Sequence, residues 1–147
     1  MLAMTKKTGY GLIAMTHLAR LGRDEVASAR EIADRFGAPT SLLMNVLKQL
    51  AGAGHVESIR GAHGGYRLAR DAEEISLAEV ITAVEGPIRL AECVASGEKV
   101  ADGETCRMLD RCPITDPVHR VHRRLSDFLK TVTLAELSAP AGVPAGE

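Results

Sequence analysis

Three stretches in the first half of the chain repeat apolar residues at helical spacing. In residues 4–23 the apolar side chains recur every three or four positions, which predicts an amphipathic helix. A second helix is predicted from the capping-box sequence of residues 28–31 to Gly37, and a third from near Ser41 to Gly52. The apolar faces consist of Tyr10, Ile13, Ala14, Leu18 and Leu21 in the first helix, Ile32, Ala33 and Phe36 in the second, and Leu43, Val46, Leu47 and Leu50 in the third.

Two short apolar runs follow the third helix and predict a pair of strands. The first covers residues 55–59, the second passes through Tyr66 and Leu68, and the sequence between them is rich in glycine. Glycine has no Cβ atom, so it lets a chain turn sharply and approach another surface closely. Two helices joined by a short turn, with a two-stranded loop after the second, describe a winged helix-turn-helix, in which the loop is the wing.

The second half contains one more short helix and one long helix. A capping box at residues 76–79 opens the short helix, which ends at Gly86. Asp116 and Pro117 are predicted as the N-cap and first position of the long helix. Its apolar stripe is narrower than a globular face requires, so we expect it to pair with a second copy of the chain. Packing onto its own domain is the alternative. The stripe consists of Val118, Val121, Leu125, Phe128 and Val132, and the other sides carry His119, Arg120, His122, Arg123 and Arg124.

Composition and charge narrow the class of protein. Hydrophobic residues make up 46% and charged residues 25% of the chain, an ordinary globular composition for one domain of this size. Residues 1–70 carry ten basic and five acidic side chains, whereas residues 71–147 carry eight and fourteen. A basic first half beside an acidic second half is expected when one end of a protein meets nucleic acid. No apolar run approaches the ~20 residues of a membrane helix, and the N-terminus does not read as a secretory signal, so we expect a cytoplasmic protein without membrane contact.

The outward face of the third helix and the wing carry the candidate DNA contacts. Asn and Gln side chains can read adenine edges, Ser can bond bases or phosphates, and Leu or Met can touch thymine methyl groups. A lysine such as Lys48 would hold a phosphate, and an arginine on the wing such as Arg60 would enter a minor groove. A merely exposed polar face is the alternative. The predicted DNA-binding residues are Ser41, Leu42, Met44, Asn45, Lys48, Arg60, Gly64 and Gly65, with Gln49 also facing outward and Lys6, Lys7, His63 and Arg67 as further backbone contacts.

Enzymatic functions fit the sequence poorly. The glycine-rich loop has neither the Lys-Ser/Thr pair of a Walker motif nor the spacing of a dinucleotide fingerprint, and no βαβ unit surrounds it. No cysteine stands beside a convincing base in the sequence, which argues against a thiol enzyme. We therefore expect a protein that is not an enzyme.

All three cysteines, Cys93, Cys106 and Cys112, lie in the irregular stretch between the two helices of the second half. Three cysteines in a cytoplasmic protein do not suggest a disulfide framework. Thiolates on an irregular segment can converge on one metal centre, and soft thiolates suit an iron–sulfur cluster or zinc. Structural zinc usually has paired Cys-x-x-Cys ligands, which are absent from this sequence. An iron–sulfur cluster is therefore favoured, with zinc or redox-active thiols as alternatives.

These features predict a mainly α-helical fold with a small β-hairpin, built as a winged helix-turn-helix plus a long C-terminal dimerisation helix. We expect residues 1–86 to form the DNA-binding domain and residues 87–115 to form the cysteine-bearing cluster loop. Residues 116–138 would then form the dimerisation helix with a short C-terminal helix, and residues 139–147 a disordered tail.

Four stretches of the sequence carry a family resemblance. They are TGYGLIAM in the first helix, SIRGAHGGYRLA in the wing, ISLAEVITAVEG in the second half and FLKTVTLAEL near the end. Together with the cysteine loop they resemble the iron–sulfur-responsive winged-helix repressors, the IscR-, NsrR- and RirA-like regulators, over residues 2–138. The resemblance implies a homodimeric transcriptional repressor that binds a double-stranded, pseudo-palindromic DNA operator and holds its cluster on Cys93, Cys106 and Cys112. A cluster-free winged-helix regulator with redox-active or zinc-binding cysteines is the alternative.

The resemblance also assigns residues by position. Arg60 matches the minor-groove arginine of the family, and Ser41, Met44 and Asn45 fall where its base contacts lie. Met44 replaces a glutamate that, in the cluster-assembly regulators, lets the cluster state change site choice. The usual fourth ligand falls on Thr115 or Gly9, neither of which can serve, and this favours a labile 4Fe–4S cluster over 2Fe–2S. The remaining candidates for that ligand are Glu104, Asp110, Asp116, His119, a residue of a partner chain, or water.

Overall fold

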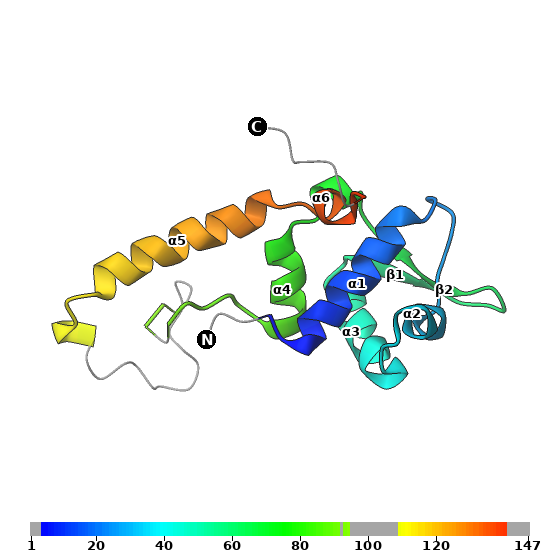
Figure 1. Ribbon diagram of the computed structural model, residues 1–147, viewed down its shortest axis with the longest axis horizontal. Coiled ribbons are helices and arrows are strands. Elements are labelled where there is room, and N and C mark those ends of the chain that lie inside the picture. The colour runs from blue at the N-terminus through cyan, green and yellow to red at the C-terminus, as the bar shows by residue number, and fades with distance from the viewer. Residues whose placement is uncertain (1–3, 92, 95–108, 141–147) are drawn as a thin grey trace.

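The computed structural model describes residues 4–91, 93–94 and 109–140, and it shows a helical domain with a small hairpin and one long helix (Figure 1). The predicted fold class is confirmed. The elements, in chain order, are α1 (Lys6–Arg20), α2 (Ala29–Phe36), α3 (Thr40–Gly52), β1 (Val56–Ile59), β2 (Gly65–Leu68), η1 (Ala72–Glu74), α4 (Leu77–Glu85), η2 (Leu109–Arg111), α5 (Thr115–Thr131) and α6 (Leu134–Ser138).

Local sequence signals set the ends of the helix-turn-helix. The Ser28 hydroxyl accepts a hydrogen bond from the Glu31 backbone N–H, and the Glu31 carboxylate accepts one from the Ser28 N–H at 2.7 Å, which completes the predicted capping box of α2. Gly37 ends α2 with a φ of 67°, a conformation that glycine adopts most readily. α1 is shorter than the predicted 4–23, because the backbone is already extended at Thr5 and at Leu21.

The wing is an antiparallel hairpin that is fixed to the rest of the domain. Val56 pairs with Leu68 and Ile59 with Gly65, so the first strand begins one residue later than predicted. The Tyr66 N–H donates to the Ala27 carbonyl at 2.8 Å, and the Ala27 N–H donates back to the Tyr66 carbonyl at 3.0 Å. This bridge attaches β2 to the segment that leads into α2 and so fixes the wing relative to α2.

The hydrophobic core lies between α1, α3 and α4, with α2 and α6 closing its sides (Figure 1). Gly11 lets α1 approach closely, since a Cβ atom there would lie 3.1 Å from Val46 Cγ1 of α3. Phe36, predicted on the apolar face of α2, is 44% exposed and meets the His17 ring edge-on, which corrects that assignment. The largest fully buried side chains are Met15, Ile32, Leu43, Leu47, Leu50, Ile75, Leu134, Val46, Val80 and Thr8.

The C-terminal end of α5 is anchored to the core. α6 begins with a capping box at Thr133 and buries Leu134 completely. The Leu134 N–H donates to the Ile75 carbonyl at 2.8 Å, and the Leu77 N–H donates to the Val132 carbonyl at the same distance. At its other end α5 begins at Thr115 with Ile114 as N-cap. The predicted N-cap at Asp116 is therefore wrong by two residues, and Asp116 lies inside the first turn. Among the described residues, no helix combines the length and the apolar character that crossing a bilayer demands.

Candidate DNA-binding surface and cysteine region

The outward face of α3 is as polar as its sequence predicted. Its periodicity places four aliphatic side chains in the core and leaves the opposite face open, because residues three and four apart share a side of a helix. Pro39 occupies the N-cap and makes no side-chain cap hydrogen bond. Ser41, Met44, Asn45, Lys48 and Gln49 are exposed, Leu42 is half-buried, and Leu43, Val46, Leu47 and Leu50 are buried. The face is therefore available to a ligand, while contact of each residue with DNA stays a prediction.

Glycines determine the shape of the wing. A Cβ atom on Gly64 would lie 2.3 Å from the Ile59 carbonyl oxygen, and one on Gly65 would lie 2.7 Å from the Ala27 carbonyl oxygen. Gly61 has a φ of 129°, which side chains disfavour. Gly64 and Gly65, which are predicted as DNA contacts, are thus needed for the backbone path of the wing. Their contact with DNA stays a prediction. Arg60 is exposed beside this turn and forms no ion pair with any described residue.

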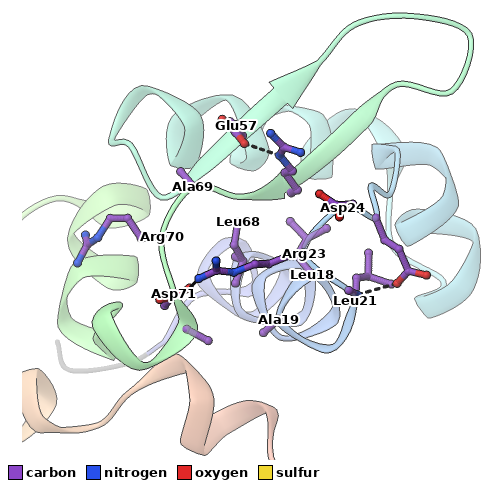
Figure 2. A pocket seen from close by; sticks show the side chains of 14 residues that line it. Leu18, Ala19, Leu21, Arg23, Asp24, Glu57, Leu68, Ala69, Arg70 and Asp71 are labelled. Carbon is purple, nitrogen blue, oxygen red and sulfur yellow. Dashed lines mark hydrogen bonds and ion pairs between the residues drawn. The ribbon is translucent and has the colours of Figure 1, made fainter.

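A polar cavity of about 480 Å³ lies behind the wing, between the end of α1 and the chain that follows β2 (Figure 2). Four of its charged side chains form two ion pairs with one another. Arg67 donates to the Glu57 carboxylate across the hairpin, and Arg23 donates to Asp71 at 2.6 Å. Because Arg67 is already in an ion pair, it is a weaker candidate for a phosphate contact than Arg60. The antiparallel register that pairs Glu57 with Arg67 could have revealed this from the sequence.

The start of α1 is bound to the end of α4. Both the Thr5 and the Thr8 hydroxyl donate to the Glu85 carboxylate, the latter at 2.6 Å, and these hydrogen bonds lower the pKa of Glu85. Lys7 Nζ donates to the Val84 carbonyl at 3.2 Å, so the ammonium group already has a hydrogen-bond partner within the domain. Lys6 is exposed. Gly9 lies on the open side of α1, with no atom within 4 Å of a Cβ placed there.

Two of the three predicted cluster ligands lie in the described residues. Cys93 and Cys112 are both half-buried free thiols, whereas Cys106 and Glu104 lie outside the described residues. The backbone N–H of Ile114 hydrogen-bonds the Cys112 sulfur and lowers its pKa, with a smaller contribution from Thr115. Cys112 therefore loses its proton more readily than an ordinary thiol, and thiolate is the form that binds metal.

The donor chemistry fits a metal centre, although the described residues do not complete one. Within residues 4–91, 93–94 and 109–140, no three His, Cys, Asp or Glu side chains converge as a metal site would require. Asp110 and Asp116, two of the candidates for a fourth ligand, are exposed. The two free thiols, one of them with a lowered pKa, are the soft ligands that iron–sulfur clusters use. Cys106 would have to supply the third thiolate ligand.

A second cavity, of about 590 Å³, lies between α4, α5 and the segment that follows α4. Two histidines of α5 face it. His119 Nε2 and His122 Nδ1 are buried and have no hydrogen-bond partner among the described residues. The sequence placed both histidines away from the apolar stripe of α5 but did not reveal that they face α4. Their spacing of three residues, on one side of a helix, was the available signal.

A third histidine, the buried His55, was not singled out from the sequence. His55 is only 6% exposed, and burial lowers its pKa, with a further lowering by Arg70 and an opposing effect of Glu79. Its Nδ1 has no hydrogen-bond partner among the described residues. The sequence suggested only the start of a strand at this position.

Comparisons with known proteins agree with this geometry. The protein aau3 of Rhizobium meliloti (strain 1021) is 31% identical, over 91% of this chain and 83% of its own length. The HTH-type transcriptional regulator IscR of Vibrio campbellii (strain ATCC BAA-1116) is 34% identical, over 91% of this chain and 76% of its own length.

Solved structures of similar proteins share the fold. CymR (YrzC), the global cysteine regulator of B. subtilis, superposes with a TM-score of 0.71 at 30% identity, covering 94% of this chain and 97% of that one. IscR of T. potens superposes with a TM-score of 0.70 at 28% identity, covering 99% and 94%. The family model described as Rrf2, iron-dependent transcriptional regulator, matches residues 4–140. The chain therefore belongs to the Rrf2 family of transcriptional regulators.

Proposed function

We propose that this protein is an iron–sulfur cluster-dependent, DNA-binding transcriptional repressor that senses iron, oxygen or redox state, or nitric oxide. Its targets would be genes of iron–sulfur assembly or stress. The observation that carries the DNA-binding part is the open polar face of α3 beside a wing whose Arg60 is exposed and unpaired among the described residues. A helix of this kind reads base edges in the major groove while the wing arginine enters the neighbouring minor groove.

The cluster-dependent part rests on the cysteines. Cys93 and Cys112 are free thiols on either side of the segment that carries Cys106, and the pKa of Cys112 is lowered. The relative named IscR from Vibrio campbellii is 34% identical to this chain over 135 aligned residues. We propose Cys93, Cys106 and Cys112 as the ligands of a 4Fe–4S cluster, because three thiolates without a fourth cysteine suit a labile centre.

The apolar face of α5 supports a homodimer. Val121 and Phe128 of α5 are 53% and 61% exposed, the N-cap residue Ile114 is 58% exposed, and the three follow one another at intervals of seven residues. Side chains at this interval lie on one side of a helix, as the seam of a coiled coil does. A second copy that packs its own α5 against this face would bury all three. The dimer would bring two copies of α3 to the two halves of a pseudo-palindromic operator.

The mechanism couples the cluster to the spacing of the recognition helices. A cluster held by Cys93, Cys106 and Cys112 would rearrange residues 87–115, which run from the end of α4 to the start of α5. A ligand that binds one arrangement of this segment more tightly shifts the population of dimers toward that arrangement. Half-sites one helical turn apart tolerate little change in the separation of two recognition helices. Operator affinity would therefore follow the state of the cluster.

The test is an anaerobic purification with iron and sulfide analysis, Mössbauer spectra and operator selection from random DNA. The expected result is a brown protein with stoichiometric sulfide and a selected DNA site whose affinity changes on cluster loss. Cys112→Ala should remove the cluster, while Arg111→Ala, a neighbouring exposed residue, should keep it. Full iron and sulfide in Cys112→Ala would reject the ligand assignment.

One observation favours a second candidate, a cluster-free regulator. Structures similar to this chain include CymR of B. subtilis, a cysteine regulator, and Staphylococcus aureus CymR in an oxidized form. In this alternative the thiols of Cys93 and Cys112 respond to oxidation or hold zinc. A colourless protein that resists reconstitution but still selects an operator would support it over the cluster-dependent function.

A further inference from the structure

The cavity of about 590 Å³ between α4 and α5 has the size of a small-molecule site. Part of its lining is apolar and comes from Ala78 of α4 and from Ile88 and Val94 of the segment that follows. The rest comes mainly from α5, the long helix that extends from beside α4 in Figure 1, and consists of polar and charged side chains. The cavity therefore combines apolar surface with a few polar groups, as pockets for small organic molecules do.

Two imidazole rings of α5 line this cavity with unused hydrogen-bonding capacity. His119 Nε2 and His122 Nδ1 are buried, and neither has a hydrogen-bond partner among the described residues. The second ring nitrogen of His122 lies 3.5 Å from the Ser126 hydroxyl. When that hydroxyl donates to it, the ring proton lies on Nδ1, which leaves an N–H group without an acceptor. Because buried polar atoms normally have partners, these nitrogens indicate a ligand group with acceptor atoms.

The charged side chains around the cavity leave one cation without a carboxylate. Lys130 Nζ lies 3.4 Å from the Asp127 carboxylate, so these two charges offset each other. Arg123 also lines the cavity, is exposed, and forms no ion pair with any described residue. A guanidinium group can donate two parallel hydrogen bonds to the two oxygens of a carboxylate. The charge of Arg123 therefore favours an anion over a neutral ligand or a cation.

The apolar part of the lining favours an organic anion over inorganic phosphate. A phosphate ion has oxygen atoms on every side, and some of them would face Ala78, Ile88 and Val94, whose side chains offer no hydrogen bond. A carboxylate on a hydrocarbon body matches both parts of the lining. A metal ion is not supported, because no three His, Cys, Asp or Glu side chains converge within the described part of the chain.

We propose that the cavity between α4 and α5 binds a small organic carboxylate. The carboxylate is held by Arg123, His119 and His122, and the apolar body packs against Ala78 and Ile88. This site goes beyond the proposed cluster-dependent function and does not depend on it, because no described cysteine lines the cavity. The ligand contacts both α4, which packs on α1 and α3, and the helix whose exposed face is proposed to form the dimer. It therefore gives the regulator an input separate from its cysteines.

The experiment is isothermal titration calorimetry of the full-length protein with benzoate and hexanoate as probes. We expect dissociation constants on the order of 1 mM, since such small molecules make few contacts. Benzamide and hexanol keep the apolar body without the negative charge and should bind about 10-fold more weakly. Arg123→Ala should weaken benzoate binding about 10-fold as well, whereas the neighbouring Arg124→Ala, which does not line the cavity, should change it less than about 2-fold.

Nuclear magnetic resonance of ¹⁵N-histidine-labelled protein locates the bound probe. We expect benzoate to shift the ring nitrogen signals that are missing in His119→Ala and His122→Ala, and to leave the signal of the exposed His63 in place. Circular dichroism checks that each variant is folded. Benzoate that binds without shifting the signals of His119 or His122 would overturn the location of the site.

The remaining outcomes separate the chemistry of the ligand from non-specific attraction. Equal binding of benzoate and benzamide, or equal losses in Arg123→Ala and Arg124→Ala, would overturn the carboxylate site. Inorganic phosphate that binds more tightly than benzoate would overturn the choice of an organic anion. No binding of either carboxylate at about 50 times the expected dissociation constant would overturn the inference as a whole. The iron and sulfide contents are measured separately, so none of these results decides the cluster-dependent function.

Discussion

Gly65 of the wing lies so close to Ala27 that a Cβ atom on the glycine would be 2.6 Å from the alanine carbonyl carbon. The contact is backbone against backbone, so no side chain can rotate away to make room. It accompanies the pair of hydrogen bonds between Ala27 and Tyr66. The placement of the wing relative to α2 therefore depends on the absence of a single methyl group.

Replacing Gly65 with alanine should separate the wing from this segment. Overpacking of a rigid site typically destabilises a protein by about 1–3 kcal/mol, and we expect Gly65→Ala to lower the free energy of unfolding by that amount. Affinity for DNA should fall as well, because the wing would lose its fixed position beside α3. Urea unfolding and fluorescence anisotropy measure the two effects. An unchanged urea midpoint would show that the backbone contact is not rigid.

Gly9→Ala is the matched control, and it should act in the opposite direction. Gly9 lies inside α1 with no atom within 4 Å of a Cβ position. Alanine is favoured over glycine in a helix interior by about 1 kcal/mol, so we expect a gain in stability of up to that size. The measurement is again urea unfolding. A loss of stability would mean that the open side of α1 is covered by another part of the assembly.

Arg60→Ala should weaken DNA binding far more than Arg67→Ala. Arg60 forms no ion pair with a described residue, whereas Arg67 is paired with Glu57. We expect the Arg60 substitution to cost about 1–3 kcal/mol of specific binding. Titrations of the selected operator at matched salt concentration measure it. Equal losses for both arginines would contradict the assignment of Arg60 to the groove.

Stability should fall in mild acid because of His55. Burial lowers the pKa of His55 in the folded protein, while the unfolded chain takes up its proton near the ordinary value of about 6.5. Below that pH the unfolded state binds more protons, so the free energy of unfolding decreases as the pH falls toward the folded-state pKa. Glu79 opposes this lowering of the pKa and Arg70 adds to it. Glu79 and Lys130 line a shallow hollow together with His55.

The comparison of His55→Gln with the wild-type protein isolates this contribution. The variant should show a flatter dependence of stability on pH between 7.5 and 5, as measured by thermal or urea unfolding at several pH values. His63→Gln, at the exposed tip of the wing, should keep the wild-type slope. If the two variants behave alike, the acid sensitivity comes from elsewhere in the protein, for example from His17, whose pKa burial also lowers.

Val121→Asp should dissociate the proposed homodimer. The side chain is 53% exposed on the apolar face of α5, and a buried unpaired carboxylate in its place would oppose association. Light scattering after size-exclusion chromatography should show monomers for Val121→Asp and dimers for the control Arg124→Ala. A dimeric Val121→Asp protein with wild-type affinity would place the interface on another surface.

The parts of the structure that depend on neighbouring residues in the chain were predictable. Capping boxes, glycine stops and the alternation of buried and exposed residues in α3 are local, so the outward set from Ser41 to Gln49 followed from periodicity alone. The same reasoning misjudged Phe36, because its exposure is decided by how α1 and His17 lie against α2. It also misplaced the start of α5, where Asp116 and Pro117 fit the first turn as well as the cap.

The features that depend on packing between distant elements could not be predicted. The unpartnered nitrogens of His119 and His122 arise only because α5 lies against α4. The burial of His55 and the close approach of Gly65 to Ala27 likewise depend on segments that are far apart in sequence. Residues 95–108, with Cys106, lie outside the described residues, so the predicted cluster loop stays a prediction.

The anchoring of α6 clamps the C-terminal end of α5, while α4 supports one side of the same helix. Leu134 fixes the clamp in the core, and seventeen residues of helix extend from it for about 25 Å. One degree of rotation at the clamp moves the far end by about 0.4 Å, given that length. A small rotation at Thr133 would therefore correspond to a much larger displacement near Cys112. A force that holds the Cys112 end in place would act, through the length of α5, on the hydrogen bonds between residues 75–77 and 132–134.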